Sequence, residues 1–293
     1  GFLMNTIWSD YVQGIKTLYL SRKLRFDDIF FDQYKTLFDI DTERNLNILE
    51  IGCGPGALAT SLHRWYPNAE ITAIDRDSNF ITYAKGSAQE INFLEGDAEK
   101  LPFCDCTFDI TISNTVSEHI EPSKFFGEQM RVLKPGGICL VLSSRRGITS
   151  KAECLETSDT EKKFWQKAES EYDTTYDKYS ICKYPMSESA LPLEMEKYGF
   201  KNIRCGYALI DLTPDDPKYS AKIAHDMINA DRYTSIEAVD AAVRYNKNIN
   251  ADEAEKVKQI INEKYDKRTA LYDDGKKQWD TNVSIIMVVR GVK

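Results

Sequence analysis

The segment 48–56, Ile-Leu-Glu-Ile-Gly-Cys-Gly-Pro-Gly, constrains the fold of this chain more than any other part of its sequence. Its apolar run ends in three alternating glycines, Gly52, Gly54 and Gly56. A strand that enters a loop without Cβ atoms lets the backbone approach a ligand closely, and a nucleotide-sized cofactor is the usual ligand of such a loop. We therefore expect a buried strand that leads directly into a cofactor site.

Short β-like runs alternate with helical patterns between about residues 46 and 145, which is typical of a parallel sheet with helices on its faces. The second helix of the pattern is expected to begin with Ser78 as its cap and to end at Gly86. The predicted fold class is α/β, with a doubly wound, mostly parallel sheet of seven strands at residues 46–51, 71–74, 91–94, 108–112, 138–143, 203–210 and 283–289.

Helical periodicity also precedes and interrupts this pattern. We expect an N-terminal helical cap at residues 1–44 and a main domain at 45–293. The main domain would contain a lid insertion at about 150–186 and one long helical insertion at about 214–280. The lid carries an aromatic cluster suited to the wall of a small-molecule pocket, namely Phe164, Trp165, Tyr172, Tyr176, Tyr179 and Tyr184. The insertions could equally form an interface between copies of the chain.

Composition narrows the function classes. The net charge of -8 gives no global attraction to phosphate backbones, so nucleic acid is not expected as the main partner. No apolar run is long enough for a membrane span, and the first residues lack the basic segment of a secretory signal. Seven cysteines without paired spacing fit a reducing cytoplasm, and the pair Cys104 and Cys106 lies far from every histidine, so we expect no metal site.

Asp75 follows the second strand, where an acidic residue can hold the hydroxyls of a ribose. Two cofactor classes combine such a residue with a glycine loop, so the loop alone does not choose between them. The dinucleotide fingerprint has the spacing G-x-G-x-x-G, whereas this loop has G-x-G-x-G followed by Ala57.

Four motifs in order resemble those of the class I S-adenosylmethionine-dependent methyltransferases. They are Leu-Glu-Ile-Gly-Cys-Gly-Pro-Gly at 49–56, Ile-Asp at 74–75, Gly-Asp-Ala-Glu-Lys-Leu-Pro-Phe at 96–103 and Arg-Val-Leu-Lys-Pro-Gly-Gly at 131–137. The resemblance covers roughly residues 45 to 145. It implies a Rossmann-like fold and S-adenosyl-L-methionine as the cofactor.

The resemblance also implies a role for individual residues. The backbone of the loop would pass under the methionine and ribose of the cofactor, with Glu50 beside it; the loop residues are Gly52, Cys53, Gly54, Pro55 and Gly56. Asp75 would accept both ribose hydroxyls, and Arg76 would lie beside the adenine.

The remaining implied contacts lie at the ends of the third and fourth strands. Asp97 would accept the adenine amino group, and Ala98 would offer its N–H to a ring nitrogen. Ser113 would present its carbonyl near the methionine ammonium, and Asn114 would line the same wall.

Methyl transfer depends mostly on placing the nucleophile and excluding water, so few residues qualify as catalytic. His119 follows the fourth strand and could act as a base, although it could also simply pack. Tyr11 and Tyr19 could close over the sulfonium or belong to the core.

Two basic clusters could bind anions, although solvent exposure explains both equally well. An arginine in the segment 21–25, Ser-Arg-Lys-Leu-Arg, could grip the cofactor carboxylate. Arg145 and Arg146 could hold an anionic acceptor.

The expected function is S-adenosylmethionine-dependent methyl transfer to a small-molecule acceptor by in-line displacement. The alternatives are an NAD-dependent oxidoreductase, which the third and fourth motifs disfavour, and a non-catalytic protein that binds S-adenosylmethionine. The sequence fits a cytoplasmic protein without a nucleic-acid partner.

Overall fold

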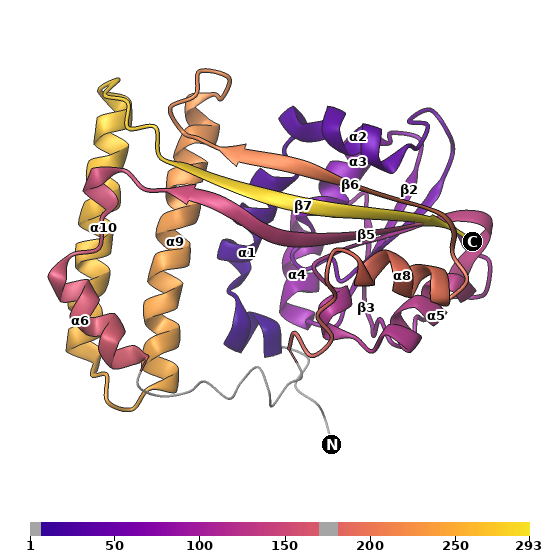
Figure 1. Cartoon of the computed structure of the whole chain (residues 1–293), viewed down its shortest axis with the longest axis horizontal. Helices are drawn as coiled ribbons and strands as arrows, with labels where there is room; N and C mark the ends of the chain where they lie inside the picture. Colours follow the sequence, from indigo (N-terminus) through magenta and orange to yellow (C-terminus); the bar gives the residue numbers. More distant parts are fainter. Residues whose placement is uncertain (1–6, 170–180) are drawn as a thin grey trace. The chain divides into compact units, whose positions relative to one another are not determined.

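The computed structural model describes residues 7–169 and 181–293 (Figure 1). The chain divides into two compact units. The sheet unit comprises residues 1–146, 176–210 and 285–293, and the helical unit comprises 147–175 and 211–284. Within the described ranges, no helix is both long and apolar enough to cross a membrane.

Among the described residues, seven strands form one sheet in the order β3-β2-β1-β4-β5-β7-β6 (Figure 1). They are β1 (Asn47–Ile51), β2 (Glu70–Asp75), β3 (Asn92–Glu95), β4 (Phe108–Asn114), β5 (Leu133–Ser150), β6 (Lys201–Leu212) and β7 (Thr281–Val292). The pairs β1–β2, β1–β4, β2–β3 and β4–β5 are parallel. The start of β5 meets the end of β7 through hydrogen bonds from Gly136 N–H to Lys293 and from Lys293 N–H to Gly137, so these two strands run in opposite directions. The predicted α/β class with a mostly parallel seven-stranded sheet is confirmed.

Parallel pairing explains where the site lies. In the register of the sheet, Ile51 pairs with Ile74 on one side and with Ser113 on the other. The carboxyl ends of β1, β2 and β4 therefore lie together at one edge of the sheet. Ligands of open α/β sheets bind outside this edge, where the strand order reverses.

Helices cover the sheet within its unit. They are α1 (Ile15–Arg25), α2 (Phe31–Phe38), α3 (Ala57–Trp65), α4 (Ser78–Ser87), α5 (Pro122–Val132) and α8 (Ala190–Lys197), with the short turns η1 (Trp8–Val12), η2 (Asp28–Phe30) and η3 (Ser117–His119). Helix α1 packs against α3 and α4. Helices α5 and α8 share one apolar core with the strands, in which Phe125, Phe126, Leu191 and Met195 are fully buried.

Two boundaries of α4 differ from the sequence expectation. Its N-cap is Asp77 rather than Ser78, because the Asp77 carboxylate accepts hydrogen bonds from the N–H groups of Asn79 and Phe80. The helix also continues through Gly86 to Ser87. Gly86 has no left-handed φ, so it does not terminate the helix.

The helical unit contains η4 (Glu153–Leu155), α6 (Asp159–Ala168), α9 (Ala221–Tyr245) and α10 (Ala251–Asp273). The single long helix expected within the insertion at about 214–280 is in fact two helices, since α9 ends at the C-cap Asn246 and α10 starts at the N-cap Asn250. Phe164 of the expected lid is buried in the core of this unit, and Trp165 packs against that core. Tyr172, Tyr176 and Tyr179 lie outside the described residues.

A buried ion network lies in the helical unit near the C-terminal end of α10. The Arg268 side chain is inaccessible to solvent and contacts Asp215 at 2.9 Å and Asp280 at 2.7 Å. Asp215 also accepts hydrogen bonds from the N–H groups of Gln278 and Trp279. The network joins α10 to the segments that follow β6 and precede β7, and its buried charges compensate one another.

Candidate functional site

The loop after β1 requires its glycines. Gly52, Gly54 and Gly56 have φ values of +70°, +53° and +91°, a region that residues with a Cβ rarely adopt. A Cβ at Gly52 would collide with Val116 after β4, and a Cβ at Gly56 would lie 2.8 Å from Phe93 of β3. The N–H groups of Gly52 and Cys53 both donate to the carbonyl of Ile74, which holds the loop against β2.

Asp75 is fixed beside this loop by two backbone donors. Its Oδ2 accepts a hydrogen bond from Gly54 N–H and its Oδ1 from Asp77 N–H, both at 2.8 Å. Burial raises the pKa of Asp75 to about 6 although these donors oppose the shift. Each carboxylate oxygen keeps a further lone pair for a ligand hydroxyl.

Glu50 carries a buried oxygen without a partner. The residue is 2% exposed, and among the described residues nothing donates a hydrogen bond to its Oε2. Burial, together with the neighbouring charge of Asp75, raises the pKa of Glu50 well above its usual value. Such an orphaned acceptor is costly unless a ligand satisfies it. It therefore fits a cationic or N–H donor group at this point.

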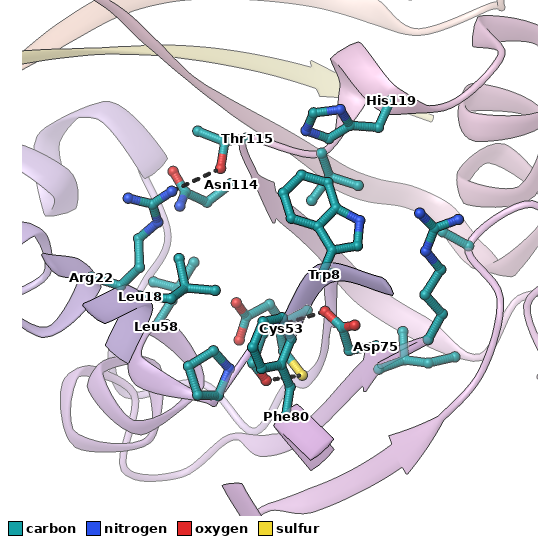
Figure 2. A pocket seen from close by; sticks show the side chains of 18 of the residues that line it. Trp8, Leu18, Arg22, Cys53, Leu58, Asp75, Phe80, Asn114, Thr115 and His119 are labelled. Carbon is teal, nitrogen blue, oxygen red and sulfur yellow. Dashed lines mark hydrogen bonds between the residues drawn. The ribbon is translucent and has the colours of Figure 1, made fainter. Parts of the chain in front are cut away.

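These residues border a cavity of about 350 Å³ in the sheet unit (Figure 2). Most of the residues that we expect to form the site line it, namely Glu50, Gly52, Cys53, Gly54, Pro55, Asp75, Arg76, Asp97, Ala98, Asn114 and His119. The structure thus brings together residues from the ends of β1, β2, β3 and β4.

Three expected residues lie elsewhere. The side chain of Ser113 is fully buried inside β4, one residue before the lining begins. Gly56 packs against Phe93 and Ala84, so its role here is the close approach of α3 to the sheet. Tyr19 does not line the cavity; its ring packs against that of Tyr83 on α4, with a centroid distance of 5.3 Å. This geometry does not favour Tyr19 as a catalytic residue.

His119 ends the short turn η3 and is held from two sides. Its Nδ1 accepts a hydrogen bond of 2.9 Å from Cys182 N–H, and its ring lies edge-to-face with Trp8 at 4.8 Å. Burial lowers the pKa of His119, although the Glu118 carboxylate opposes the shift. A neutral ring with an occupied Nδ1 carries its proton on Nε2. In this arrangement His119 offers a hydrogen-bond donor and has no free lone pair for a base.

Sequence reasoning missed much of the lining. The residues that it did not propose for the site are Trp8, Gln13, Leu18, Phe26, Ala57, Leu58, Ile74, Phe80, Gly96, Glu99, Thr115, Val116 and Ile120. Trp8 lies in the middle of the group drawn in Figure 2, between His119 and Asp75. The turn that carries it is anchored by Ser9, whose N–H and hydroxyl both donate to the Asp77 carboxylate. No local motif marks Trp8, because its contacts span more than 60 residues of sequence.

The two basic clusters differ in their position relative to the cavity. Arg22 of α1 lines the cavity and contacts Thr115 at its wall (Figure 2). Arg145 instead donates from Nη1 to the carbonyl of Met186 at 2.8 Å and lies 3.6 Å from Glu188. Arg145 therefore fixes the segment that follows the undescribed residues, and it does not line the cavity.

The fold and the site together define a protein that binds a nucleotide-type cofactor at the carboxyl edge of a doubly wound sheet. Comparison with known proteins narrows this class. Residues 49–141 match the family model described as a methyltransferase domain. This part of the chain is a class I S-adenosylmethionine-dependent methyltransferase domain, and its cofactor is S-adenosyl-L-methionine.

Curated relatives match over this region. The chain is 37% identical over 100 residues to a ubiquinone/menaquinone biosynthesis C-methyltransferase from Desulfotalea psychrophila, which covers 33% of this chain and 41% of the relative. It is 36% identical over 111 residues to a fatty-acid O-methyltransferase from Mycolicibacterium smegmatis, covering 36% and 39%. The match thus spans about two fifths of the length of each relative.

A solved structure matches over a larger part of the fold. Phosphoethanolamine N-methyltransferase 2 from Haemonchus contortus, in complex with S-adenosyl-L-methionine, superposes with a TM-score of 0.53 at 16% identity. The alignment covers 100% of this chain and 60% of that protein. At this level of identity the likeness concerns the fold alone.

Proposed function

We propose that this protein transfers the methyl group of S-adenosylmethionine to a small-molecule acceptor by in-line displacement. The observation that carries the proposal is the cavity at the ends of β1, β2 and β4. There the glycine loop, the fixed carboxylate of Asp75 and the orphaned Oε2 of Glu50 form one wall. The methyltransferase relatives, which are named for C- and O-methyl transfer, support it.

The residues present fit the cofactor. The glycine loop would lie under its methionine and ribose, and Asp75 would accept the ribose hydroxyls in a charge-assisted contact. The orphaned Oε2 of Glu50 suits the ammonium group. Arg76, Asp97 and Ala98 line the part of the cavity assigned to the adenine. Asn114 would continue the wall toward the methionine.

S-adenosylmethionine supplies a methyl group on a sulfonium, which needs little activation. The work of the protein is then to orient the acceptor and to exclude water. Apolar side chains such as Trp8, Leu18, Phe80 and Val116 enclose the cavity and serve this purpose. His119 would orient the acceptor as a hydrogen-bond donor.

The function is tested by incubating the full chain with methyl-labelled S-adenosylmethionine and a whole-cell extract, which is then separated into small-molecule and nucleic-acid fractions. We expect label in a small-molecule product and an equal amount of S-adenosylhomocysteine. A protein that retains the cofactor but moves no label into any extract would be a binding protein rather than an enzyme. Label in the nucleic-acid fraction alone would contradict a small-molecule acceptor.

The proposal includes the setting of the enzyme. The negative net charge and the unpaired cysteines support a cytoplasmic location without a nucleic-acid partner. Residues 1–44 would act as the cap of the cofactor cavity, while the insertions at about 150–186 and 214–280 would join two copies of the chain. Light scattering after size-exclusion chromatography would measure the oligomeric state.

A further inference from the structure

Helix α1 brings Arg22 to the wall of the cavity, with Arg25 next to it outside the lining. Arg22 and Arg25 are one helical turn apart, so they share a face of α1. Arg22 Nη2 lies 3.4 Å from the Thr115 hydroxyl, and Arg25 Nη1 lies 3.4 Å from Asn114 Oδ1. Both contacts reach the residues that end β4, and Figure 2 shows Arg22 beside Asn114 and Thr115, away from Asp75.

Neither of the two guanidinium groups is paired directly with an anion among the described residues. No carboxylate of the described residues forms an ion pair with Arg22 or Arg25, and their hydrogen bonds of 3.4 to 3.5 Å are long. Burial is the main cause that lowers the pKa of both groups, and the neighbouring charge of Arg25 lowers that of Arg22 further, while the nearby Glu118 carboxylate opposes the shift of both. Both side chains are half-buried, and cations withdrawn from water in this way are normally paired. This end of the cavity is therefore complementary to a negative charge.

The cofactor does not supply that charge in full. Its carboxylate is accompanied by its own ammonium and by the sulfonium, so the bound cofactor adds a net positive charge. The acidic residues of the lining are Glu50 of β1, which is assigned to the ammonium of the cofactor, and Asp75, Asp97 and Glu99, which lie at or beyond the ends of β2 and β3, where the adenosine is placed. An anionic acceptor would balance the arginines at the end of β4.

The same end of the cavity offers hydrogen-bond donors and no free base. His119 has its Nδ1 occupied by Cys182 N–H, so its polar contribution is the Nε2–H. Glu118 does not line the cavity, and its Oε1 lies 3.9 Å from Nε2. The Glu50 carboxyl of the lining is assigned to the cofactor, so among the described lining residues beside Arg22 no further group could take a proton from an acceptor. An acceptor that is already an anion needs no such group.

Building on the methyl transfer proposed above, we propose that the acceptor is a carboxylate, held by Arg22 with Arg25 behind it and with His119 Nε2–H as a further donor. A carboxylate oxygen forms the new bond to the methyl carbon while the bond from that carbon to sulfur breaks. The electron pair of the broken bond stays on sulfur, which loses its positive charge. The products are a methyl ester and S-adenosylhomocysteine, and no proton is released.

The binding test uses the protein saturated with S-adenosylhomocysteine. It is titrated by calorimetry with a panel of linear and aromatic monocarboxylates, such as octanoate and benzoate, and with their carboxamides. We expect at least one carboxylate to bind about tenfold or more tightly than its amide, as a charge-assisted contact would give. Arg22→Met should abolish the difference and Arg22→Lys should restore part of it. Arg44→Ala, which removes an exposed arginine before β1, is the matched control and should change nothing.

Thermal stability separates this role from a structural one. Because Arg22 is a cation without an anion in the cavity, Arg22→Met should keep or raise the melting temperature. A lower melting temperature with an unchanged preference for carboxylates would make Arg22 a structural residue and overturn the proposal. No carboxylate binding more tightly than its matched amide would overturn it as well.

Two further arms identify the source of the carboxylate. If Arg22→Met weakens S-adenosylmethionine but not its decarboxylated analogue, the arginines hold the cofactor and the proposal fails. Label transferred to the panel should be released as volatile methanol by alkali, as a methyl ester requires. Label in an alkali-stable product would leave the proposed methyltransferase function intact and contradict the carboxylate acceptor, whereas absent cofactor binding would refute the function itself.

Discussion

At the scale of single residues, the site is defined by buried polar groups that the protein itself does not satisfy. Asp75 is held by two backbone donors and keeps a lone pair on each oxygen, Glu50 keeps an orphaned oxygen, and Arg22 forms no ion pair with a carboxylate of the described residues. The cost of leaving such groups unpaired is comparable to the gain from binding a ligand that pairs them. These unsatisfied groups therefore indicate which chemical groups a ligand of the cavity carries.

The pKa of Asp75 predicts a pH dependence of cofactor binding. The raised pKa of about 6 means that Asp75 gains a proton as the pH falls through 6, and the protonated group is a weaker acceptor for the ribose hydroxyls. We expect the affinity for S-adenosylhomocysteine, measured by calorimetry between pH 5 and 8, to fall below about pH 6. Asp75→Asn should lose about 1.5 to 3 kcal/mol of binding and this pH dependence.

The raised pKa of Asp75 also makes folding stability depend on pH, but in the opposite direction to cofactor binding. A folded-state pKa above the unfolded value of about 3.9 means that the native state holds the proton more tightly. The stabilisation is present below the unfolded pKa and is lost as the pH rises through about 6. Asp32→Asn, an exposed change on α2, is the control. An unchanged affinity in Asp75→Asn would remove Asp75 from the site.

At the scale of elements, the start of α3 packs closely against β3 and α4. Gly56→Ala places a Cβ 2.8 Å from Phe93 Cζ and 3.1 Å from the Ala84 Cβ, at a φ of +91°. We expect it to lower the free energy of unfolding by about 2 kcal/mol or more and to weaken cofactor binding, because α3 must move away from the sheet. Urea denaturation would measure the first effect.

Gly86 gives a matched control for this substitution. It lies inside α4, and a Cβ there would meet nothing within 4 Å. Gly86→Ala should therefore raise the free energy of unfolding by about 0.5 to 1 kcal/mol, the usual gain of alanine over glycine in a helix. Equal destabilisation by both substitutions would show that the close packing at Gly56 does not matter.

The elements also show which parts of the fold a sequence can reveal. The strands and the glycine loop could be predicted because their signals are local: apolar runs, glycines and an acidic residue at a strand end. The break between α9 and α10 was missed, although Asn246 and Asn250 mark it as caps. The helical periodicity continues on both sides of the short connection between α9 and α10, so the pattern predicts one helix.

The cavity wall opposite the glycine loop could not be predicted in the same way. Trp8 and Arg22 come from the N-terminal segment, and His119 gains its tautomer from Cys182, 63 residues further on. Tyr19 has the same helical spacing as core residues, and only the fold shows that it faces Tyr83 rather than the cavity. Contacts between distant segments leave no pattern in one sequence.

At the scale of the whole molecule, the chain combines a sheet unit, which contains the cofactor cavity, with a helical unit that has its own apolar core. All residues that line the cavity belong to the sheet unit. The helical unit is inserted between strands of the sheet, and its buried network of Arg268, Asp215 and Asp280 makes it internally stable. Relatives match over about two fifths of their lengths, within the region of the cofactor motifs.

The most direct test of the central claim is isothermal titration calorimetry of the full chain with S-adenosylmethionine, S-adenosylhomocysteine and NAD. We predict that the first two bind to one common site and displace each other, and that NAD neither binds there nor competes. Glu50→Gln, which removes a carboxylate from the cavity without adding bulk, should weaken both ligands. Binding of NAD without binding of S-adenosylmethionine would contradict the account.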